Sequence, residues 1–224
     1  LFSLQGPVAK NIVSTFIPNL EKLFFLNCIS TTIKNINCFV SRSGYSGEDG
    51  FEISVDNKDA LDLAGILLNT SEVRLVGLGA RDSLRLEAGL CLYGHEIDEN
   101  TTPFEANLMW AIPKKRMKEG GFIGYKKLLE QSQQVANKTR IGLVMSDKMV
   151  ARKNNEILND QGKRIGAITS GTFSPSLNVP IGMGYINNLE KLQNHPTVLI
   201  RKKKCQAKLS RLPFVQTRYY KYIS

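Results

Sequence analysis

Apolar and polar residues alternate in two short runs in the first quarter of the chain. Ile36–Val40 is rich in β-forming residues, and Phe51–Val55 alternates apolar with polar side chains. The segment between them, Gly47–Gly50, contains an Asp-Gly pair and two glycines. This pattern predicts a β-hairpin whose returning strand turns its apolar side chains toward a core and Glu52 away from it.

Helical spacing of apolar residues marks three further segments. It predicts a short helix within residues 1–23, a capped amphipathic helix over Lys58–Leu68, and another helix that begins after the glycine-rich turn at Gly77. Val73–Val76, V-R-L-V, is typical of a strand. Residues 36–90 are therefore expected to form an α+β arrangement.

The pattern becomes irregular after His95 and changes again from Thr139. Lys114–Lys138 is charged and predicts a linker with one helix at Tyr125–Glu130. Beyond it, short β-rich runs are separated by Gly, Asn, Asp and Pro, which is typical of an all-β barrel or sandwich. The predicted organisation is an α+β domain at 1–120, a linker and helix at 121–138, and an all-β barrel domain at 139–224.

The composition, with 42% hydrophobic and 22% charged residues, is that of a soluble globular protein. No apolar run reaches the roughly 18–20 residues that a membrane span needs, so no membrane association is expected. The first residues, L-F-S-L-Q-G-P-V-A-K, include no initiator Met and no basic leader. They are typical of the interior of a longer protein, so the chain is expected to be a fragment.

Four scattered cysteines, without any C-x-x-C pair, do not suggest a metal site. The chain has two histidines, which makes a zinc site hard to assemble, and no metal is expected. Reduced, buried thiols are the expected state of Cys28, Cys38, Cys91 and Cys205.

The net charge of +10 indicates either an anionic partner or a contribution to solubility alone. The basic residues are spread over several segments, and none has the aromatic signature of an RNA-binding module. Nucleic acid is therefore not an expected partner.

Candidate chemistry is sparse when the residues are taken singly. Glu52 is an outward carboxylate on a strand, a position that is more often solvated than functional. Arg81 lies where a glycine-rich turn enters a helix, where it either points into a site or pairs with Asp82 or Glu87. The segment Ser170–Ser176 is expected to be a polar loop without a nearby histidine, which argues against a serine nucleophile.

The motifs taken in order resemble a known family. G-Y-S-G-E-D-G-F-E-I-S is followed by G-A-R-D-S-L-R-L-E-A-G-L-C-L-Y-G-H-E-I-D-E-N-T-T-P-F-E-A-N-L-M-W, and then by I-G-A-I-T-S-G-T-F-S-P-S-L, I-G-M-G-Y-I and the closing L-P-F-V-Q-T-R-Y-Y. The whole chain resembles the aminomethyltransferases, the T-proteins of the glycine cleavage system. The resemblance implies a folate-binding aminomethyltransferase-like domain, present in part, followed by a C-terminal β-barrel.

The resemblance also implies an activity. Members of the family transfer the methylene carbon of an aminomethyl group, carried on the lipoyl arm of H-protein, to tetrahydrofolate, and they release ammonia. Glu52 matches the glutamate that reads the pterin, Arg81 and Tyr219 match further folate-site positions, and Tyr45 matches a tyrosine of the same pocket. The chemistry of a carboxylate is consistent with this role for Glu52, because a carboxylate on a rigid strand can accept both hydrogen bonds of a two-donor ring edge.

The departure from the family lies at the start of the chain. The resemblance places the aspartate that acts on the reacting folate nitrogen in an N-terminal segment that this sequence lacks, so no catalytic residue is assigned. Asp49 and Asp82 are expected to serve in a turn and at a helix start. By their sequence alone, Tyr219 and Tyr220 are more typical of barrel packing than of ligand contact.

Two other functions stay open on the sequence. One is a truncated, non-catalytic module that binds folate or a partner. The other is a relative with the same fold, such as the folate domain of a dimethylglycine or sarcosine dehydrogenase or a folate-binding tRNA-modification protein. The resemblance implies the mitochondrial matrix for a eukaryotic source and the cytoplasm otherwise.

Overall fold

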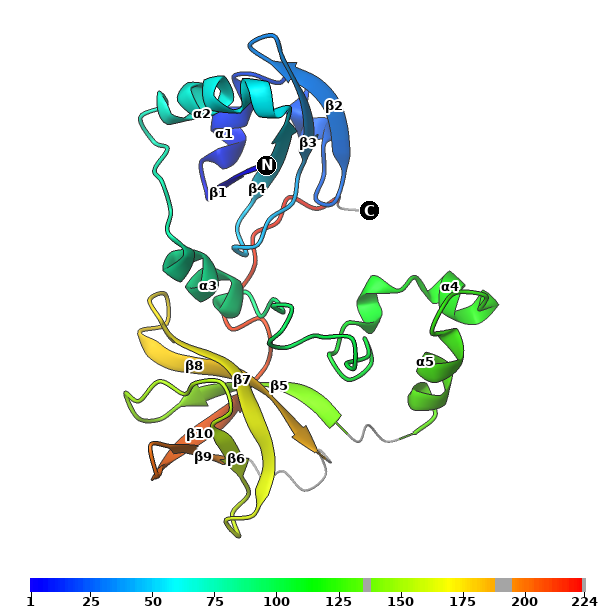
Figure 1. The fold of residues 1–224 in the computed structure, drawn as a ribbon, viewed down its shortest axis with the longest axis vertical. Helices are drawn as coiled ribbons and strands as arrows, with labels where there is room; N and C mark the ends of the chain where they lie inside the picture. Colours follow the sequence, from blue (N-terminus) through cyan, green and yellow to red (C-terminus); the bar gives the residue numbers. More distant parts are fainter. Residues whose placement is uncertain (135–137, 188–194, 223–224) are drawn as a thin grey trace. The chain divides into compact units, whose positions relative to one another are not determined.

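The chain forms two compact units, each with its own sheet and core (Figure 1). The computed structural model describes residues 1–134, 138–187 and 195–222. The first unit comprises Leu1–Ala88 and the chain end from Gln216, and the second comprises Gly89–Val215. The predicted order, an α+β part followed by a barrel, is confirmed.

In the first unit, an antiparallel sheet with the strand order β1-β4-β3-β2 carries helices on one face. Its elements are β1 (Phe2–Gln5), α1 (Ala9–Ser14), the 3-10 helix η1 (Leu20–Lys22), β2 (Cys28–Ile33), β3 (Ile36–Ser41), β4 (Gly50–Val55), η2 (Asn57–Asp59), α2 (Ala60–Leu68) and α3 (Leu78–Glu87).

The alternation predicted for the returning strand is present in β4. Phe51 and Ile53 are fully buried, whereas Glu52 is partly exposed on the opposite face. The buried residues of the sheet join Val13 of α1 and Leu63 of α2 in one hydrophobic core. Burial of such apolar side chains contributes about 1.5–3 kcal/mol each, so this core determines which face of the sheet the helices cover.

The helix predicted within residues 1–23 is confirmed as α1, two strands were not predicted, and one local prediction is wrong. The strands that were not predicted are β1, before that helix, and β2, before the predicted hairpin. Val73–Val76 is a loop instead of a strand, with the side chains of Leu75 and Val76 85% and 66% exposed. A strand needs a paired neighbour as well as suitable residues, and Val73–Val76 pairs with neither of the two edge strands of this sheet, β1 and β2.

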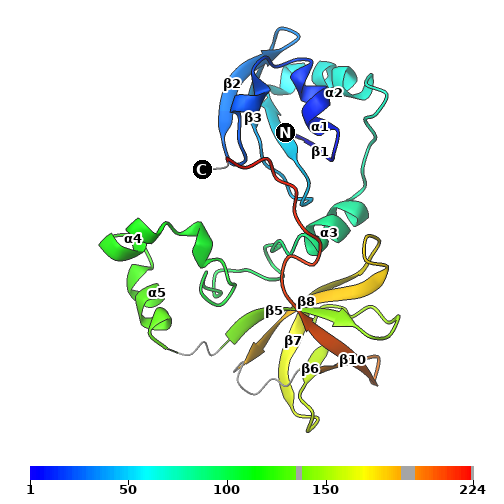
Figure 2. The same ribbon diagram turned by 180° about the vertical axis from the view of Figure 1, so that it is seen from behind.

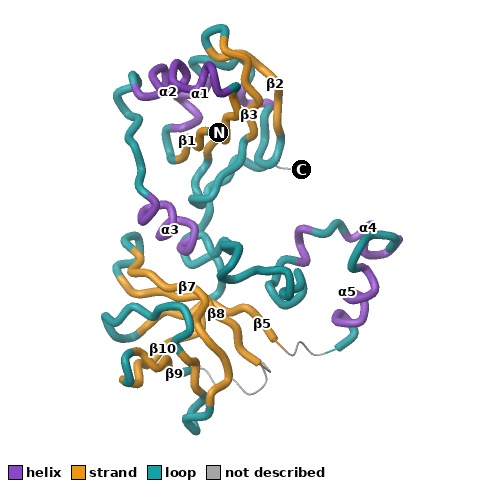
Figure 3. The backbone as a smooth tube through the Cα atoms, viewed as in Figure 1, coloured by secondary structure: helices purple, strands orange, loops and turns teal. Residues whose placement is uncertain are grey.

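The second unit contains a closed antiparallel barrel with the strand order β10-β5-β8-β7-β6-β9, seen from behind in Figure 2 and by element type in Figure 3. Its elements are η3 (Met109–Ala111), α4 (Lys114–Glu119), α5 (Tyr125–Ser132), β5 (Lys138–Met145), β6 (Glu156–Leu158), β7 (Arg164–Ser174), β8 (Val179–Asn187), β9 (Thr197–Ile200) and β10 (Lys203–Ser210). Helix α5 confirms the helix predicted at Tyr125–Glu130, and α4 was not predicted.

The irregular segment from Gly89 to Asn107 is bound to the barrel by a buried arginine on β5. The guanidinium of Arg140 donates to the carbonyl oxygens of Gly89 and Ala106, both at 2.8 Å. The side-chain amide of Asn107 donates in turn to the Arg140 carbonyl oxygen at 2.9 Å. These bonds satisfy backbone groups that regular structure does not pair, which explains why residues 89–107 group with the barrel. The predicted domain boundaries at residues 120 and 139 stay a prediction.

In the first unit, a second buried arginine joins β3 to the loop that follows it. Arg42 is completely buried, and its Nε donates to Asp49 Oδ1 at 2.9 Å while Nη2 bonds the other carboxylate oxygen. Asp49 is therefore more than the turn residue that its Asp-Gly context predicts. The eight residues 42–49 connect β3 to β4, so the connection is a structured loop and not a tight turn.

The chain end packs on the first unit, so the prediction that Tyr219 and Tyr220 pack in the barrel is wrong. Tyr219 stacks on Phe25 with a centroid separation of 4.0 Å, and Tyr220 stacks on Phe24 at 5.5 Å. The backbone N–H of Arg218 donates to the Gly47 carbonyl oxygen at 2.8 Å. Local sequence contains no trace of these partners, which lie about 170 to 195 positions earlier.

Gly166→Ala is expected to destabilise the barrel. A Cβ at this position of β7 would lie 2.0 Å from the Tyr185 carbonyl oxygen and 2.9 Å from the Ile186 Cα on β8, so backbone must move. Overpacking of this kind costs about 1–3 kcal/mol. Calorimetry should show that the barrel unit of this variant unfolds at a lower temperature than that of the parent. Gly65→Ala on α2, where no atom lies within 4 Å, should instead add about 0.5–1 kcal/mol, and an equal loss in both variants would contradict the argument.

Asp49→Asn is expected to lower the free energy of unfolding of the first unit by about 3 kcal/mol, because it leaves the buried Arg42 cation without its anion. The neighbouring Glu48→Gln is the matched control, since Glu48 pairs with the exposed Arg218 and should cost less than about 1 kcal/mol. Urea unfolding read by hydrogen exchange of β3 and β4 measures both. Similar losses in the free energy of unfolding for the two variants would show that the Arg42–Asp49 pair contributes no more than the exposed Glu48–Arg218 pair.

Candidate functional site

The structure brings together two of the four residues that the sequence nominates as a site. The guanidinium carbon of Arg81, in the first turn of α3, lies 4.9 Å from the ring centroid of Tyr45, within the range of a cation–π contact. Asp82 pairs with Arg85 at 2.7 Å, so Arg81 does not take up the predicted pairing with Asp82.

Tyr45 and Arg81 both line a cavity of about 390 Å³ in the first unit. Most of its wall is apolar and comes from β1, α1, α2 and residues 72–76, and Gln5, Ser46 and Arg74 add polar groups. A mostly apolar cavity with a few convergent polar groups is the usual form of a small-molecule site. The volume lies at the small end of the range for such sites.

Glu52 lies on the opposite face of the sheet, the face without helices. Ser3 of β1 and Ser41 of β3 stand beside it in register. The Ser43 hydroxyl donates to Glu52 Oε2 at 2.7 Å. Because β4 has a paired strand on each side, the backbone that carries Glu52 is held more firmly than a loop would be.

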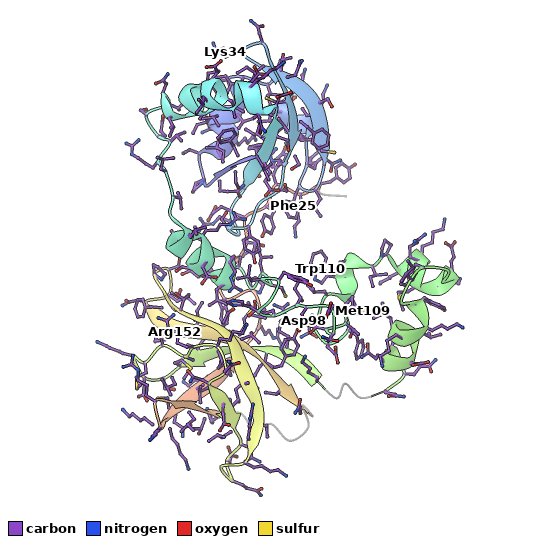
Figure 4. The ribbon with its side chains drawn as sticks, viewed as in Figure 1. Phe25, Lys34, Asp98, Met109, Trp110 and Arg152 are labelled. Atoms are coloured by element: carbon purple, nitrogen blue, oxygen red, sulfur yellow. The ribbon has the colours of Figure 1, made fainter. Side chains whose placement is uncertain are left out.

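Tyr219 comes from the chain end. Its ring lies almost parallel to that of Phe25, at an interplanar angle of 10°. Burial raises the pKa of the Tyr219 phenol, which therefore stays protonated and able to donate a hydrogen bond at neutral pH. Phe25 and Lys34 mark opposite ends of this sheet (Figure 4), so Tyr219 belongs to the end from which residues 42–49 also leave.

All four nominated residues thus belong to the first unit, but they do not line one cavity. Among the described residues, the wall of the 390 Å³ cavity includes Tyr45 and Arg81 and leaves out Glu52 and Tyr219. The loop 42–49 links the two groups. It carries Tyr45, its Ser43 hydroxyl donates to Glu52, and its Gly47 carbonyl oxygen accepts from the backbone N–H of Arg218, the neighbour of Tyr219. The folate-site roles of the four residues stay predictions.

Sequence reasoning missed Arg42 and Ser43. The signal for Arg42 is its phase, since Cys38 and Val40 point inward and position 42 continues that face. A charged residue at an inward position requires a counter-ion within reach, here the partly exposed Asp49. No comparable signal marks Ser43, whose contact with Glu52 depends on the path of the loop.

The expectation that Ser170 has no nearby histidine is wrong. Ser170 lies on β7 rather than in a loop, and His95 Nδ1 is 3.1 Å from its hydroxyl oxygen. Ser170 is only 5% exposed, however, which keeps its hydroxyl from a substrate carbonyl. The neighbouring Glu96 accepts from the Thr169 hydroxyl at 2.6 Å, so this cluster attaches residues 95–96 to the barrel.

Cysteine, metal and membrane chemistry add little. All four cysteines are free thiols, with Cys38 and Cys205 buried and Cys28 exposed, contrary to the expectation of uniform burial. Burial raises the pKa of the Cys38 and Cys205 thiols, which makes them poor nucleophiles.

Within residues 1–134, 138–187 and 195–222, no group of three His, Cys, Asp or Glu is placed to hold a metal ion. None of the described helices has the length and apolarity needed to cross a bilayer.

The chain is similar to known proteins over nearly its whole length. Residues 1–116 match the GCVT N-terminal domain, and residues 138–216 match the glycine cleavage T-protein C-terminal barrel domain. The chain is 47% identical to the mitochondrial aminomethyltransferase of Flaveria trinervia, over 99% of this chain and 55% of the relative. It is 42% identical to a probable mitochondrial aminomethyltransferase of Schizosaccharomyces pombe, over 99% of this chain and 57% of the relative.

A crystal structure of the glycine cleavage system aminomethyltransferase T from Bartonella henselae has the same fold. It superimposes with a TM-score of 0.90 at 40% sequence identity, over 98% of this chain and 60% of that chain. The chain thus spans little more than half the length of the relatives that it matches. With matches to both of the family's domains and an antiparallel sheet followed by a closed barrel, the chain belongs to the glycine cleavage T-protein family.

Proposed function

We propose that the protein to which this chain belongs is a tetrahydrofolate-dependent aminomethyltransferase of the glycine cleavage system. In this reaction, the C–S bond of an S-aminomethyl-dihydrolipoyl group on H-protein breaks, and the sulfur leaves as the dihydrolipoyl thiol. The methylene carbon forms bonds to N5 and N10 of tetrahydrofolate, and its nitrogen leaves as ammonia. The family membership and the aminomethyltransferase names of the relatives support this assignment over a dehydrogenase-linked or tRNA-modifying relative.

The placement of Glu52 is the observation that carries the proposal. Its carboxylate stands on a central strand, faces away from the core, and is oriented by the Ser43 hydroxyl at 2.7 Å. The pterin ring of a folate presents an amino group and a ring N–H side by side, and one carboxylate can accept both. Glu52 would read this edge, and its rigid strand supplies the angular precision that such a fork requires.

The other nominated residues have chemistry that suits the rest of a folate. Tyr45 and Tyr219 offer aromatic rings, and Arg81 offers an exposed cation to the glutamate carboxylates of the substrate. No residue of this chain is proposed as the acid or base that acts on the folate nitrogen. In this proposal, the chain binds and orients the folate. For a eukaryotic source, a mitochondrial location follows from the names of the eukaryotic relatives.

The distribution of charge supports an acidic partner, for which we propose the lipoyl H-protein. Residues 138–216 contain 14 of the 30 Lys and Arg but 4 of the 20 Asp and Glu, so the rest of the chain has 16 of each and is neutral. The turn between β9 and β10 concentrates this charge in Arg201–Lys204, all exposed. A basic surface of this kind accelerates association with an acidic protein.

Glu52→Gln should weaken folate binding by about 2–5 kcal/mol, because it retains the shape but loses the charged acceptor. Calorimetric titration of the full-length protein with 5-formyltetrahydrofolate, a stable reduced folate, measures the change. Ser54→Ala, the next outward residue of β4, is the control and should bind like the parent. Parental affinity of Glu52→Gln would refute the assigned role, and transfer activity with aminomethylated H-protein tests the reaction itself.

The double variant Lys202→Glu with Lys203→Glu should slow association with H-protein by tenfold or more at low ionic strength, and the difference should shrink as salt is added. Stopped-flow measurements of the association rate provide the test. Lys126→Glu with Lys127→Glu on α5 changes the net charge equally outside the barrel strands, and it serves as the control. Equal slowing in both double variants would mean that net charge matters and the β9–β10 turn does not.

A further inference from the structure

The Arg42 side chain has an unusually complete set of partners for a residue outside the predicted site. Besides Asp49, its Nη1 donates to the carbonyl oxygen of Leu23 at 2.8 Å and, more weakly, to that of Leu20 at 3.4 Å. A guanidinium has five N–H donors in a fixed plane, so these bonds fix both its position and its orientation. The edge of the plane holds the loop 42–49 and the end of η1.

The face of the same guanidinium holds the chain end. Its central carbon lies 4.0 Å from the ring centroid of Tyr220, and the ring of Phe51 lies 5.1 Å away. The carbonyl oxygen of Tyr220 also accepts a hydrogen bond from the backbone N–H of Phe25 at 2.7 Å. Arg42 is therefore in contact with Asp49, in the loop between Tyr45 and Glu52, and with Tyr220, the neighbour of Tyr219.

Tyr219 is thereby fixed from both sides. On one side, Arg218 bonds the same loop through its backbone, to Gly47, and through its side chain, to Glu48 at 2.9 Å. On the other side stands Tyr220, stacked against Arg42. Between these two attachments, the Tyr219 ring lies flat on Phe25. The orientation of the Tyr219 ring thus depends on contacts that its neighbours make.

We propose that Arg42 is a positioning residue of the folate site, which sets Tyr219 relative to the loop that carries Tyr45 and leads to Glu52. The identity of the ligand in this inference rests on the proposed function, whereas the contacts that Arg42 makes are independent of it. Lysine cannot replace Arg42, because an ammonium has neither a fork for Asp49 nor a planar face for Tyr220. The competing explanation is an ion pair that contributes to stability alone.

The first experiment measures the attachment of the chain end without any ligand. Hydrogen exchange of peptides covering residues 216–222 and 23–27 is compared among the parent chain, Arg42→Lys, Tyr220→Leu and Tyr220→Phe. Arg42→Lys and Tyr220→Leu should each accelerate exchange in both regions by tenfold or more, whereas Tyr220→Phe keeps the ring and should keep the protection. Barrel peptides within residues 138–187 serve as an internal reference.

The second experiment separates positioning from stability. Titration with 5-formyltetrahydrofolate should show a Kd raised at least tenfold in Arg42→Lys and in Tyr220→Leu. Val40→Ala, which removes a fully buried side chain from β3 two residues before Arg42, should lower the unfolding temperature but leave the Kd within about twofold. A stability effect alone predicts that Val40→Ala and Arg42→Lys change the Kd alike, and that outcome would overturn the proposal.

The remaining outcomes also decide the case. Tyr220→Leu leaves the Arg42–Asp49 pair in place but removes the stack on Phe24 as well as the contact with Arg42, so it is compared with Phe24→Leu, which removes that stack but keeps the contact with Arg42. If Arg42→Lys does not fold, a larger effect of Tyr220→Leu than of Phe24→Leu supplies the answer. Unchanged exchange of residues 216–222 in Tyr220→Leu would show that Arg42 does not position the chain end. If the full-length parent protein binds no folate, the proposed function fails, and the exchange experiment alone then decides whether Arg42 positions Tyr219.

Discussion

A buried guanidinium must find an anion and enough hydrogen-bond acceptors, because a charge removed from water is otherwise very costly. This requirement organises the first unit. Arg42 meets it with the Asp49 carboxylate, with carbonyl oxygens at the end of η1, and with the Tyr220 ring. One side chain therefore fixes a loop, a helix end and the end of the chain, none of which regular secondary structure would hold.

The barrel unit uses the same solution with a different partner set. Arg140 is buried on β5, and its guanidinium donates to carbonyl oxygens of the irregular segment 89–107. Because long loops carry backbone groups that must be paired or solvated, an arginine with five donors is an efficient way to attach one. Arg140 lies on strand β5 and Arg42 directly follows strand β3, while most of their acceptors lie in irregular structure, so each sheet serves as a fixed reference for the loops.

This arrangement suits a site whose residues come from distant parts of the sequence. Glu52 is held by strand pairing, Arg81 by the first turn of a helix, and Tyr45 and Tyr219 by loop and tail contacts. The strand fixes angles closely, whereas the loop and tail depend on side-chain contacts that single substitutions can remove. In the proposed folate site, the carboxylate would thus come from the sheet, and the aromatic rings would come from segments that side-chain contacts hold.

The sequence by itself determined several of the regular elements and the nomination of the site. Alternation in Phe51–Val55 set the inward and outward faces of β4, because a strand has a strict two-residue period, and the short β-rich runs after residue 138 indicated the barrel. The ordered motifs nominated Glu52, Arg81, Tyr45 and Tyr219. The tertiary structure decided the rest: V-R-L-V has the residues of a strand but pairs with neither edge of the sheet, and Asp49 has the sequence of a turn but the role of the anion for a buried arginine. The chain end illustrates the limit most clearly, since Tyr219 and Tyr220 have their partners in Phe25 and Arg42, and contacts across such separations leave no local pattern in the sequence.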